Sequence, residues 1–473
     1  MNDPAPHART LQVLFDSQRR AFTAHPYPGD RQRRGHLLAL EQVLRGGATE
    51  LAQAIHEDFG CRSVSETQLL EIFPSLEGIR HARRHLKRWM RPERRSVSLW
   101  FQPGRARVLP QPLGVVGIIV PWNYPLFLSL APLTAALAAG NRVMIKMSEL
   151  TPRTGEVLGK LLHGAFPEDL VAVVNGDADV ARAFAGLPFD HLLFTGSTAV
   201  GREVMRAAAV HLTPVTLELG GKSPAIVAPG FPLAEAAEKI MFGKCANAGQ
   251  TCVAPDYVLV PAGAEQAFAE AAGAAVARLY PTLATNPDYS AIVNERHYQR
   301  LAGYLEEARA GGAKVLELNP AGERLDPRAR KLAPALVLEA AADQRLMREE
   351  IFGPILPVVP YEDLDAALRY VADRPRPLAL YYFDRDPARI RRVLEETHSG
   401  GVTVNDVILH VVQEDLPFGG VGPSGMGQYH GRHGFETFSK QKGVFLQSRL
   451  SGVGLLKPPY GRRFAAMIRL LLR

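Results

Sequence analysis

Cys252 is the residue in this sequence whose chemistry is most distinctive. It lies in the segment 242–255, where small and polar residues leave a thiol accessible. A thiolate is the strongest nucleophile among the common side chains, and its reactivity depends on its pKa and on access. A second candidate, Glu218, lies among apolar residues in the segment 217–224, and apolar surroundings raise a carboxyl pKa toward that of a general base. We expect Cys252 and Glu218 to meet in space and to perform covalent catalysis on a carbonyl group.

A third candidate, Asn123, lies in the loop 121–125 between two prolines that fix its backbone. Its side-chain amide can stabilise a developing oxyanion. An asparagine in a proline-rich turn more commonly satisfies nearby backbone groups, and this is the interpretation we favour for the residue taken alone. Taken singly, Cys252 is equally consistent with inert packing and Glu218 with a paired structural carboxylate.

Two further groups of residues have the pattern of a dinucleotide site. Gly196 and Gly201 lie where an expected strand leads into an expected helix, and such glycines let a diphosphate approach the backbone. The helix that begins after Ser197 would supply amide donors and a positive dipole. Lys146 and Glu149 follow another expected strand, where a carboxylate accepts hydrogen bonds from ribose hydroxyls. A plain turn and a helix-start glutamate explain the same residues, so the pattern alone is a weak signal.

Strand and helix patterns alternate around these candidates. A chain of 473 residues is too long for one core, so we expect two or three domains. The alternation predicts a doubly wound parallel sheet, whose ligands bind at the carboxyl ends of the strands. Buried parallel strands are predicted at 115–120, 143–146, 170–174 and 191–194, a helical region at 30–89 and extended chain at 96–112.

The predicted fold class is α/β, with two doubly wound α/β domains, one Rossmann-like, and a small β arm for oligomerisation. The second α/β unit is expected to begin near residue 213. The expected boundaries are 1–95 and 112–212 for a dinucleotide-binding domain, 213–425 for a catalytic domain, 96–111 and 426–455 for oligomerisation or bridging segments, and 456–473 for a basic C-terminal tail.

Charge and cysteine content narrow the class of protein. The net formal charge is +7, and basic residues gather in the segment 80–95. No nucleic-acid motif and no interleaved aromatic residues accompany them, so we favour a solvated helix face over an anion-binding surface and expect no nucleic-acid partner. Three cysteines argue against a disulfide framework and for a reducing compartment. With no signal-peptide pattern and no long apolar run, we expect a cytoplasmic protein. We identify no metal site.

Together these segments resemble the aldehyde dehydrogenase superfamily, from roughly residue 10 to residue 455. The resemblance is carried, in family order, by 121–125, Lys146 with Ser148 and Glu149, 194–198, 217–224, 247–252, 350–354 and 417–420. The motifs at 422–427 and 429–431 are similar to the class 3 branch. Within that branch the segments 14–19, 72–74 and 83–85 look most like bacterial coniferyl-aldehyde dehydrogenases.

The resemblance implies a role for each position. Cys252 would attack the aldehyde carbon, and Asn123 with the Cys252 amide would hold the oxyanion. Loss of hydride to the nicotinamide would leave a thioester, and Glu218 would activate the water that hydrolyses it, with Glu350 as a rival base. The implied binding residues are Lys146, Glu149, Gly196, Ser197, Gly201, Leu219, Glu350 and Phe352 for NAD or NADP, and Tyr124 and Phe418 for the substrate.

The implied function is oxidation of an aldehyde to its carboxylic acid with NAD or NADP. The substrate would be aromatic or phenylpropenal, such as coniferyl aldehyde, or medium-chain aliphatic. Two alternatives are a CoA-acylating relative, which the base Glu218 argues against, and a non-catalytic relative, which the intact Cys252, Asn123 and Glu350 argue against.

Two segments suggest contacts beyond the substrate. The exposed strand expected at 96–112 is a candidate for pairing with a second copy, so we expect a homodimer. The tail at 456–473 is basic and amphipathic and could lie on an anionic membrane, although a helix packed on the protein or a frayed end is the favoured interpretation.

Overall fold

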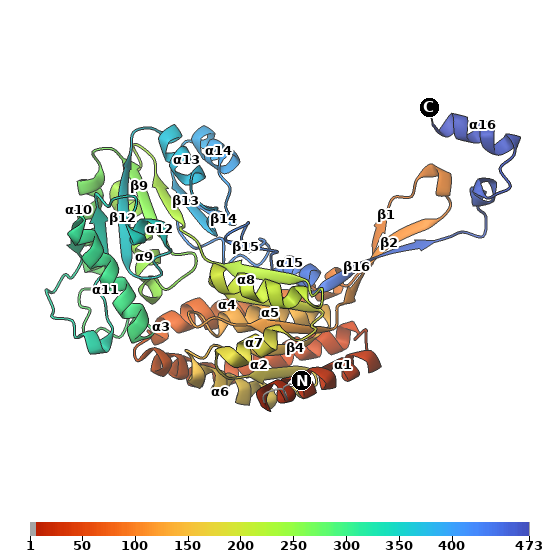
Figure 1. The fold of residues 1–473 in the computed structure, drawn as a ribbon, viewed down its shortest axis with the longest axis horizontal. Coiled ribbons are helices and arrows are strands. Elements are labelled where there is room, and N and C mark those ends of the chain that lie inside the picture. Colours follow the sequence, from red (N-terminus) through yellow and green to blue (C-terminus); the bar gives the residue numbers. More distant parts are fainter. Residues whose placement is uncertain (1–5, 473) are drawn as a thin grey trace.

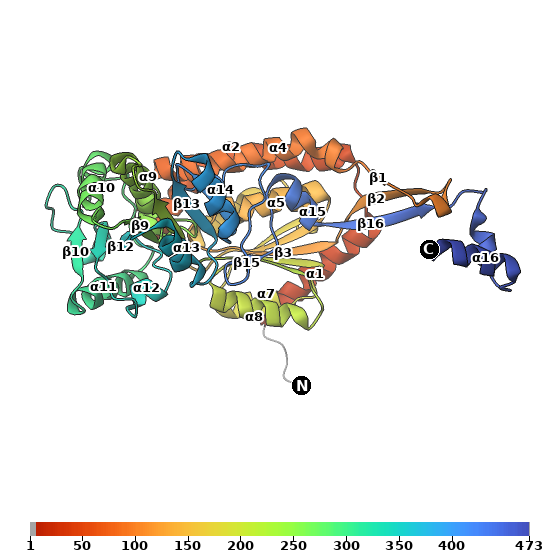
Figure 2. The same cartoon turned by 90° about the horizontal axis from the view of Figure 1, so that it is seen from above.

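The computed structural model describes residues 6–472 and contains three β-sheets. A six-stranded and a seven-stranded sheet, each flanked by helices, form two adjoining α/β units (Figure 1). A three-stranded antiparallel sheet projects from the body as an arm (Figure 2). The predicted α/β class with two parallel-sheet units and a small β arm is therefore confirmed.

The six-stranded sheet has the order β15-β7-β6-β3-β4-β5. All its neighbours are parallel except β15, which runs antiparallel to β7. The strands are β3 (Val115–Ile119), β4 (Arg142–Lys146), β5 (Val171–Val174), β6 (His191–Gly196), β7 (Val215–Leu219) and β15 (Gly425–Met426). Most of their residues are buried because helices cover both faces of the sheet. The strands predicted between residues 115 and 194 are confirmed.

Helices lie on both faces of this sheet, with α2, α4 and α5 on one side and α1, α7 and α8 on the other (Figure 2). The helices of this unit are α1 (Pro6–Ala24), α2 (Asp30–Phe59), α3 (Val64–Thr67), α4 (Phe73–Trp89), α5 (Phe127–Ala139), α6 (Pro152–His163), α7 (Ala178–Ala185) and α8 (Thr198–Ala209). The helical region predicted at 30–89 is interrupted, because Gly60 ends α2 with a left-handed φ of 75°. A π-helical turn, η1 (Gln68–Ile72), joins α3 to α4.

The seven-stranded sheet has the order β10-β11-β12-β9-β8-β13-β14, and only β10 is antiparallel to its neighbour. Its strands are β8 (Pro224–Val227), β9 (Tyr257–Pro261), β10 (Lys314–Glu317), β11 (Ala335–Leu338), β12 (Ile355–Tyr361), β13 (Ala379–Phe383) and β14 (Gly401–Val404). Its helices are α9 (Leu233–Cys245), α10 (Glu265–Leu279), α11 (Glu295–Ala310), α12 (Arg345–Arg348), α13 (Leu364–Ala372) and α14 (Pro387–Glu396).

The crossing between the two sheets lies further along the chain than the boundary expected at 213. β7 pairs in parallel with β6, so it belongs to the first sheet and not to the second. Alternation along the sequence does not reveal this, because strand pairing is a long-range contact. The chain passes to the second sheet between Leu219 and Pro224, which leaves Glu218 in the first unit and Cys252 in the second.

The arm consists of β1 (Glu93–Arg95), β2 (Arg105–Pro112) and β16 (Ser439–Leu446). The extended chain predicted at 96–112 is only partly a strand, because η2 (Leu99–Phe101) is a 3-10 turn at the tip of the arm. β2 pairs along its whole length with β16 of the same chain. The expected boundary at 95 therefore divides an arm that begins with β1.

The C-terminal region follows the arm. α15 (Gly431–Thr437) packs on α5 before the chain enters β16. Beyond the arm, η5 (Gly452–Leu456) leads to α16 (Arg462–Leu471), which lies away from both sheets and has no buried residue (Figure 1). Among residues 6–472, no helix has the length and apolar character needed to cross a membrane.

Candidate active site

A cavity of about 220 Å³ lies between the two α/β units. Cys252, Glu218 and Asn123 all line it, although they come from distant parts of the sequence. The complete lining is Pro121, Trp122, Asn123, Leu128, Thr195, Gly196, Ser197, Glu218, Leu219, Gly220, Cys252, His297, Arg300, Glu350, Phe352, Leu378 and Phe418. Most of the residues expected at the site are thus brought together.

Parallel strand ends place much of this lining. Asn123 follows β3, Gly196 ends β6, and Glu218 and Leu219 end β7. These neighbouring strands run in one direction, so their carboxyl ends open on one edge of the sheet. Ligands of open α/β sheets bind at this edge.

The loop before Cys252 has an unusual backbone. Asn247 and Ala248 both have a φ of 50°, a left-handed conformation that non-glycine residues rarely adopt. Gln250 fixes the loop, because its Nε2 donates to the Asn247 carbonyl at 2.9 Å and to the Ala291 carbonyl at 3.0 Å. Strained residues persist only where the surroundings over-determine them. The loop therefore holds Cys252 in one defined position.

The Cys252 thiol is partly accessible and free. Burial raises its pKa to about 12, and the nearby carboxyl groups of Glu350 and Glu218 add to this effect. Hydrogen bonds from the backbone N–H groups of Cys252 and Val253 act in the opposite direction. The thiolate form of Cys252 is therefore not favoured by the protein groups alone, because desolvation and two acidic neighbours outweigh the amides. Attack by sulfur requires a proton acceptor or a cation in the cavity.

Glu218 is poised to hold a proton. Only 2% of its surface is exposed, and neither carboxyl oxygen has a hydrogen-bond partner among the described residues. Burial raises its pKa well above the usual value. A carboxyl group in such surroundings can exchange a proton with a water molecule or a substrate in the cavity.

Glu350 is a second acidic group at the cavity. Burial raises its pKa to about 8, although it accepts a hydrogen bond from the Gly221 N–H. A Cβ atom at Gly220 would lie 2.0 Å from a Glu350 oxygen, so only glycine permits this close approach. Phe352, two residues further on, has a left-handed φ of 49° and lines the same cavity.

Lys222 fixes the segment that carries Glu350. Its Nζ donates to the carbonyl oxygens of Leu346 at 2.8 Å and Glu349 at 2.9 Å, and it pairs with Asp256. The other oxygen of Asp256 accepts the Ile351 N–H at 3.0 Å. The segment is thus tied down on both sides of Glu350.

The residues expected to hold a dinucleotide divide into two sets. Gly196, Ser197 and Leu219 line the cavity, and the buried Thr195 hydroxyl beside them has no partner in the described chain. The Ser197 side chain caps α8 by accepting the Val200 N–H. The remaining backbone N–H groups of the first turn have no partner within the helix, so they can donate to a ligand. A Cβ at Gly201 would lie 2.7 Å from Leu219, so this glycine allows close packing of α8 on β7.

Lys146 and Glu149 lie outside the cavity, at the end of β4. Lys146 is buried and its Nζ donates to the carbonyl oxygens of Met147 at 2.7 Å and Gly176 at 2.8 Å. Glu149 is exposed. These groups fit a dinucleotide: the glycines permit close approach, the start of α8 offers N–H donors, and the exposed Glu149 carboxylate beyond β4 accepts hydrogen bonds.

The substrate residues are also divided. Phe418 lines the cavity, but Tyr124 does not. The Tyr124 hydroxyl instead hydrogen-bonds Thr251 Oγ1 at 2.7 Å, next to Cys252.

His297 and Arg300 on α11 are lining residues that sequence reasoning missed. The Trp122 ring lies 5.2 Å from His297 and 5.3 Å from Phe352, centroid to centroid. Burial lowers the His297 pKa to about 4, so this side chain is neutral at physiological pH. The only signal in the sequence is the three-residue spacing that places both on one helical face, which is common to many surface helices.

Fold and cavity together define a class: a two-unit α/β protein in which a cysteine thiol, a buried carboxyl group and an asparagine amide meet in one cavity at the carboxyl ends of parallel strands. The sequence profile of the aldehyde dehydrogenase family matches residues 8–444, and the chain belongs to that family. It is an enzyme that oxidises aldehydes to carboxylic acids.

Known relatives agree over nearly the whole chain. The chain is 58% identical to a probable coniferyl aldehyde dehydrogenase of Pseudomonas aeruginosa, over 97% of this chain and 95% of that one. The substrate-bound state of Staphylococcus aureus AldH is similar with a TM-score of 0.92 and 36% identity, covering 100% of both chains. An aldehyde dehydrogenase of Mycobacterium tuberculosis, solved with NAD+, has a TM-score of 0.84 and 27% identity, covering 94% of this chain and 91% of that one. The cofactor is accordingly a nicotinamide dinucleotide, NAD(P).

Proposed function

We propose that this enzyme oxidises its aldehyde through a covalent intermediate on Cys252. Asn123 and the Cys252 backbone amide bind the oxyanion, and Glu218 activates the hydrolytic water. The observation that carries the proposal is that all three side chains line one cavity between the two α/β units.

The chemistry follows from the order of bond changes. The Cys252 thiol gives its proton to the Glu218 carboxylate, which passes it to solvent, and the sulfur attacks the carbonyl carbon. The carbonyl oxygen takes up negative charge opposite the Asn123 amide. The oxidised nicotinamide, when bound, supplies the hydride acceptor that an aldehyde needs, because an aldehyde has no leaving group. The resulting thioester on Cys252 is hydrolysed by water that gives a proton to Glu218 and breaks the carbon–sulfur bond. Free carboxylic acid leaves, and the thiol is restored.

Residues of both units would hold the dinucleotide. Gly196 and Ser197 would face its diphosphate, with Leu219 and Gly201 setting the distance between α8 and β7. Glu350 and Phe352 would position the nicotinamide ribose. Lys146 and Glu149 would hold the adenosine end, and we propose a preference for NAD over NADP, because a free Glu149 carboxylate accepts from ribose hydroxyls and repels a 2′-phosphate.

The substrate we propose is an aromatic or phenylpropenal aldehyde such as coniferyl aldehyde. Trp122 and Phe418 give the cavity two aromatic walls beyond the residues proposed to hold the cofactor, and Leu128 adds an aliphatic one. Apolar walls with a few placed polar groups suit an aromatic ring. The name of the Pseudomonas aeruginosa relative supports the same choice.

An initial-rate screen tests the proposal. NAD and NADP are each offered with coniferyl aldehyde, benzaldehyde and hexanal, and both NADH formation and free acid are measured without CoA. We expect the highest kcat/KM for coniferyl aldehyde with NAD. A higher kcat/KM for hexanal would overturn the substrate proposal, and an absolute need for CoA would overturn hydrolysis by Glu218.

We also propose a homodimer assembled through the arm, and a cytoplasmic location. Large apolar side chains at the tip of the arm are exposed, among them Leu99, Trp100 and Phe445. Exposed apolar groups gathered in one place mark contact surfaces. Three unpaired cysteines support a reducing compartment. Membrane contact through the basic tail stays a prediction.

A further inference from the structure

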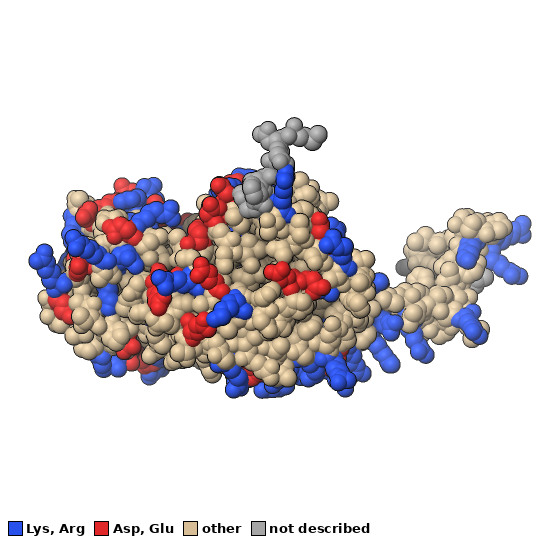
Figure 3. Space-filling view, turned by 90° about the horizontal axis from the view of Figure 1, so that it is seen from below, with Lys and Arg blue, Asp and Glu red and all other residues tan. Residues whose placement is uncertain are grey.

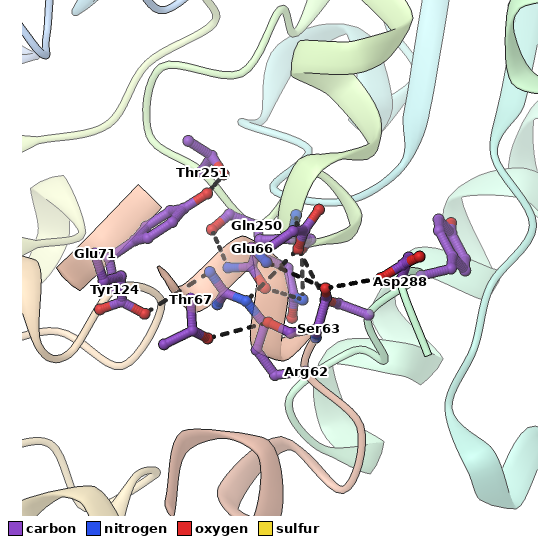
Figure 4. Close-up of polar contacts among 12 residues, drawn as sticks. Arg62, Ser63, Glu66, Thr67, Glu71, Tyr124, Gln250, Thr251 and Asp288 are labelled. Carbon is purple, nitrogen blue, oxygen red and sulfur yellow. Dashed lines mark hydrogen bonds and ion pairs between the residues drawn. The ribbon is translucent and has the colours of Figure 1, made fainter. Parts of the chain in front are cut away.

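Arg62 is fully buried outside the cavity, and the catalytic chemistry proposed above does not use it. It lies between α2 and α3, where its guanidinium faces two carboxyl groups (Figure 4). Its Nε lies 3.7 Å from a Glu66 oxygen, and its Nη2 lies 3.8 Å from a Glu71 oxygen. A charged side chain is rarely buried this completely unless it is paired, and Glu66 and Glu71 are the acidic partners of Arg62.

The guanidinium is tied to the loop that carries Asn123. Arg62 Nη1 donates to the Asn123 carbonyl oxygen at 3.0 Å. Glu71 extends the contact, because its Oε2 accepts the backbone N–H groups of Leu126 at 2.9 Å and Phe127 at 3.2 Å. The loop is thereby held from its asparagine to the start of α5.

The same cluster also holds the loop that carries Cys252. Glu66 Oε2 accepts the backbone N–H of Asn247, one of the left-handed residues, at 3.0 Å. Asn247 Nδ2 in turn donates to the carbonyl oxygens of Asn123 at 3.0 Å and Gln250 at 3.2 Å. The Asn123 carbonyl therefore accepts from Arg62 and from the cysteine loop at once.

A third connection runs through Tyr124. The Arg62 guanidinium lies 4.8 Å from the centre of its ring, and the Tyr124 hydroxyl bonds Thr251, the neighbour of Cys252. Asn123 Nδ2 donates one hydrogen bond to the Gln250 carbonyl oxygen at 3.1 Å. This bond fixes the direction of the Asn123 side-chain amide, which lines the cavity.

We propose that Arg62 is a positioning residue, which with Glu66 and Glu71 locks the Asn123 loop and the Cys252 loop together in the geometry needed for attack on the carbonyl. This inference rests on the roles proposed for Asn123 and Cys252. The oxyanion donor and the nucleophile come from different α/β units, and the cluster joins them directly. A displacement of about 1 Å between reacting groups is enough to cost about 100-fold in rate.

The test compares Arg62→Met with Arg33→Met. Arg33 is a matched control, because it is equally buried and donates to main-chain carbonyls, those of Ala138 and Ala139 at 3.1 and 2.6 Å, but touches neither loop. The measurements are thermal unfolding, the Kd for NAD+ by fluorescence titration, and kcat per folded enzyme. We expect both variants to be destabilised and to keep the wild-type Kd, and kcat to fall about 100-fold only in Arg62→Met.

Arg62→Lys keeps the charge and one donor but not the planar fork, so its kcat should lie between those of wild type and Arg62→Met. It also serves if Arg62→Met does not fold. Equal kcat values for Arg62→Met and Arg33→Met, or a wild-type kcat for Arg62→Lys when the methionine variant is unfolded, would overturn the inference alone. Activity in Cys252→Ala would instead overturn the proposed function on which this inference rests.

Discussion

At the scale of single residues, the cavity contains three acidic groups that all hold their protons strongly. Burial raises the pKa of Cys252 to about 12 and of Glu350 to about 8, and that of Glu218 well above its usual value. The carboxyl groups of Glu350 and Glu218 also disfavour ionisation of Cys252, because like charges repel strongly in a desolvated cavity. In the proposed mechanism, the protonation of these groups would therefore control when the sulfur can attack and when water can be activated.

Replacing Cys252 tests the nucleophile. Cys252→Ala should lose turnover entirely and keep NAD+ binding, because the sulfur forms the bond to substrate but the dinucleotide is held by other residues. The measurement is NADH formation together with a fluorescence titration of NAD+. Cys245→Ala is the matched control, since Cys245 is fully buried in the hydrophobic core and should be dispensable for turnover. Residual turnover in Cys252→Ala would point to another nucleophile.

The raised pKa of Glu218 predicts a pH dependence of thioester hydrolysis. Only the ionised carboxylate can accept a proton from water, and its fraction grows as pH rises toward the pKa. The rate of acyl-enzyme decay should therefore rise from neutral to alkaline pH in the wild type. Single-turnover decay measured from pH 6 to 9.5 checks this. In Glu218→Gln the rise should vanish; if it persists, the base is another group, with Glu350 first in line.

At the scale of elements, the site depends on loops at strand ends that are held by side chains outside the cavity. The Lys222–Asp256 pair holds the segment around Glu350. The cluster of Arg62, Glu66 and Glu71 holds the Asn123 loop and the Cys252 loop. Their long-range partners keep the loops in place where backbone hydrogen-bond ladders end.

Removal of the Lys222 ammonium should loosen the Glu350 segment. Lys222→Met loses the bonds to the Leu346 and Glu349 carbonyls, so we expect the Kd for NAD+ to rise about 10-fold, the size of a lost charge-assisted hydrogen bond. Isothermal titration of NAD+ measures it. Lys160→Met, which removes only an exposed pair with Glu50, should bind as the wild type does. An unchanged Kd in Lys222→Met would show that the contacts of Lys222 do not affect NAD+ binding.

Sequence patterns predicted most of the strands that carry the site, but they missed one strand pairing and several residues of the site. The buried runs at β3, β4 and β6 are visible because apolar periodicity and glycine placement are local properties. The membership of β7 in the first sheet was not visible, since parallel pairing is decided by distant strands. Arg62 and His297 were missed for the same reason: each is an ordinary residue in its local sequence and acquires its role through contacts with other segments.

At the scale of the whole molecule, the two α/β units enclose the cavity while the arm extends away from it. On the face shown in Figure 3, acidic and basic side chains are mixed over the body, whereas only basic ones appear on the arm and tail. The arm also exposes apolar residues, including 54% of Trp100 and 49% of Phe445. Such a projection is suited to contact with a second copy.

Charges at the tip of the arm should separate the proposed dimer. Trp100→Glu with Phe445→Glu places carboxylates where we propose apolar subunit contact, and burying unpaired charges is costly. Light scattering after size exclusion should show two chains for the wild type and one for the double variant. Val13→Glu, a comparably exposed apolar position on α1, should remain dimeric. A wild-type monomer would remove the proposed role of the arm.

The most direct measurement of covalent catalysis is the mass of the trapped enzyme. Glu218→Gln is mixed with NAD+ and benzaldehyde, quenched in acid, and examined intact and after digestion by mass spectrometry. We predict one added acyl group per chain, mapped to Cys252, because the nucleophile is intact while hydrolysis is slowed. An enzyme that turns over with no acyl group on Cys252, or that carries it on Cys61 or Cys245, would contradict the mechanism.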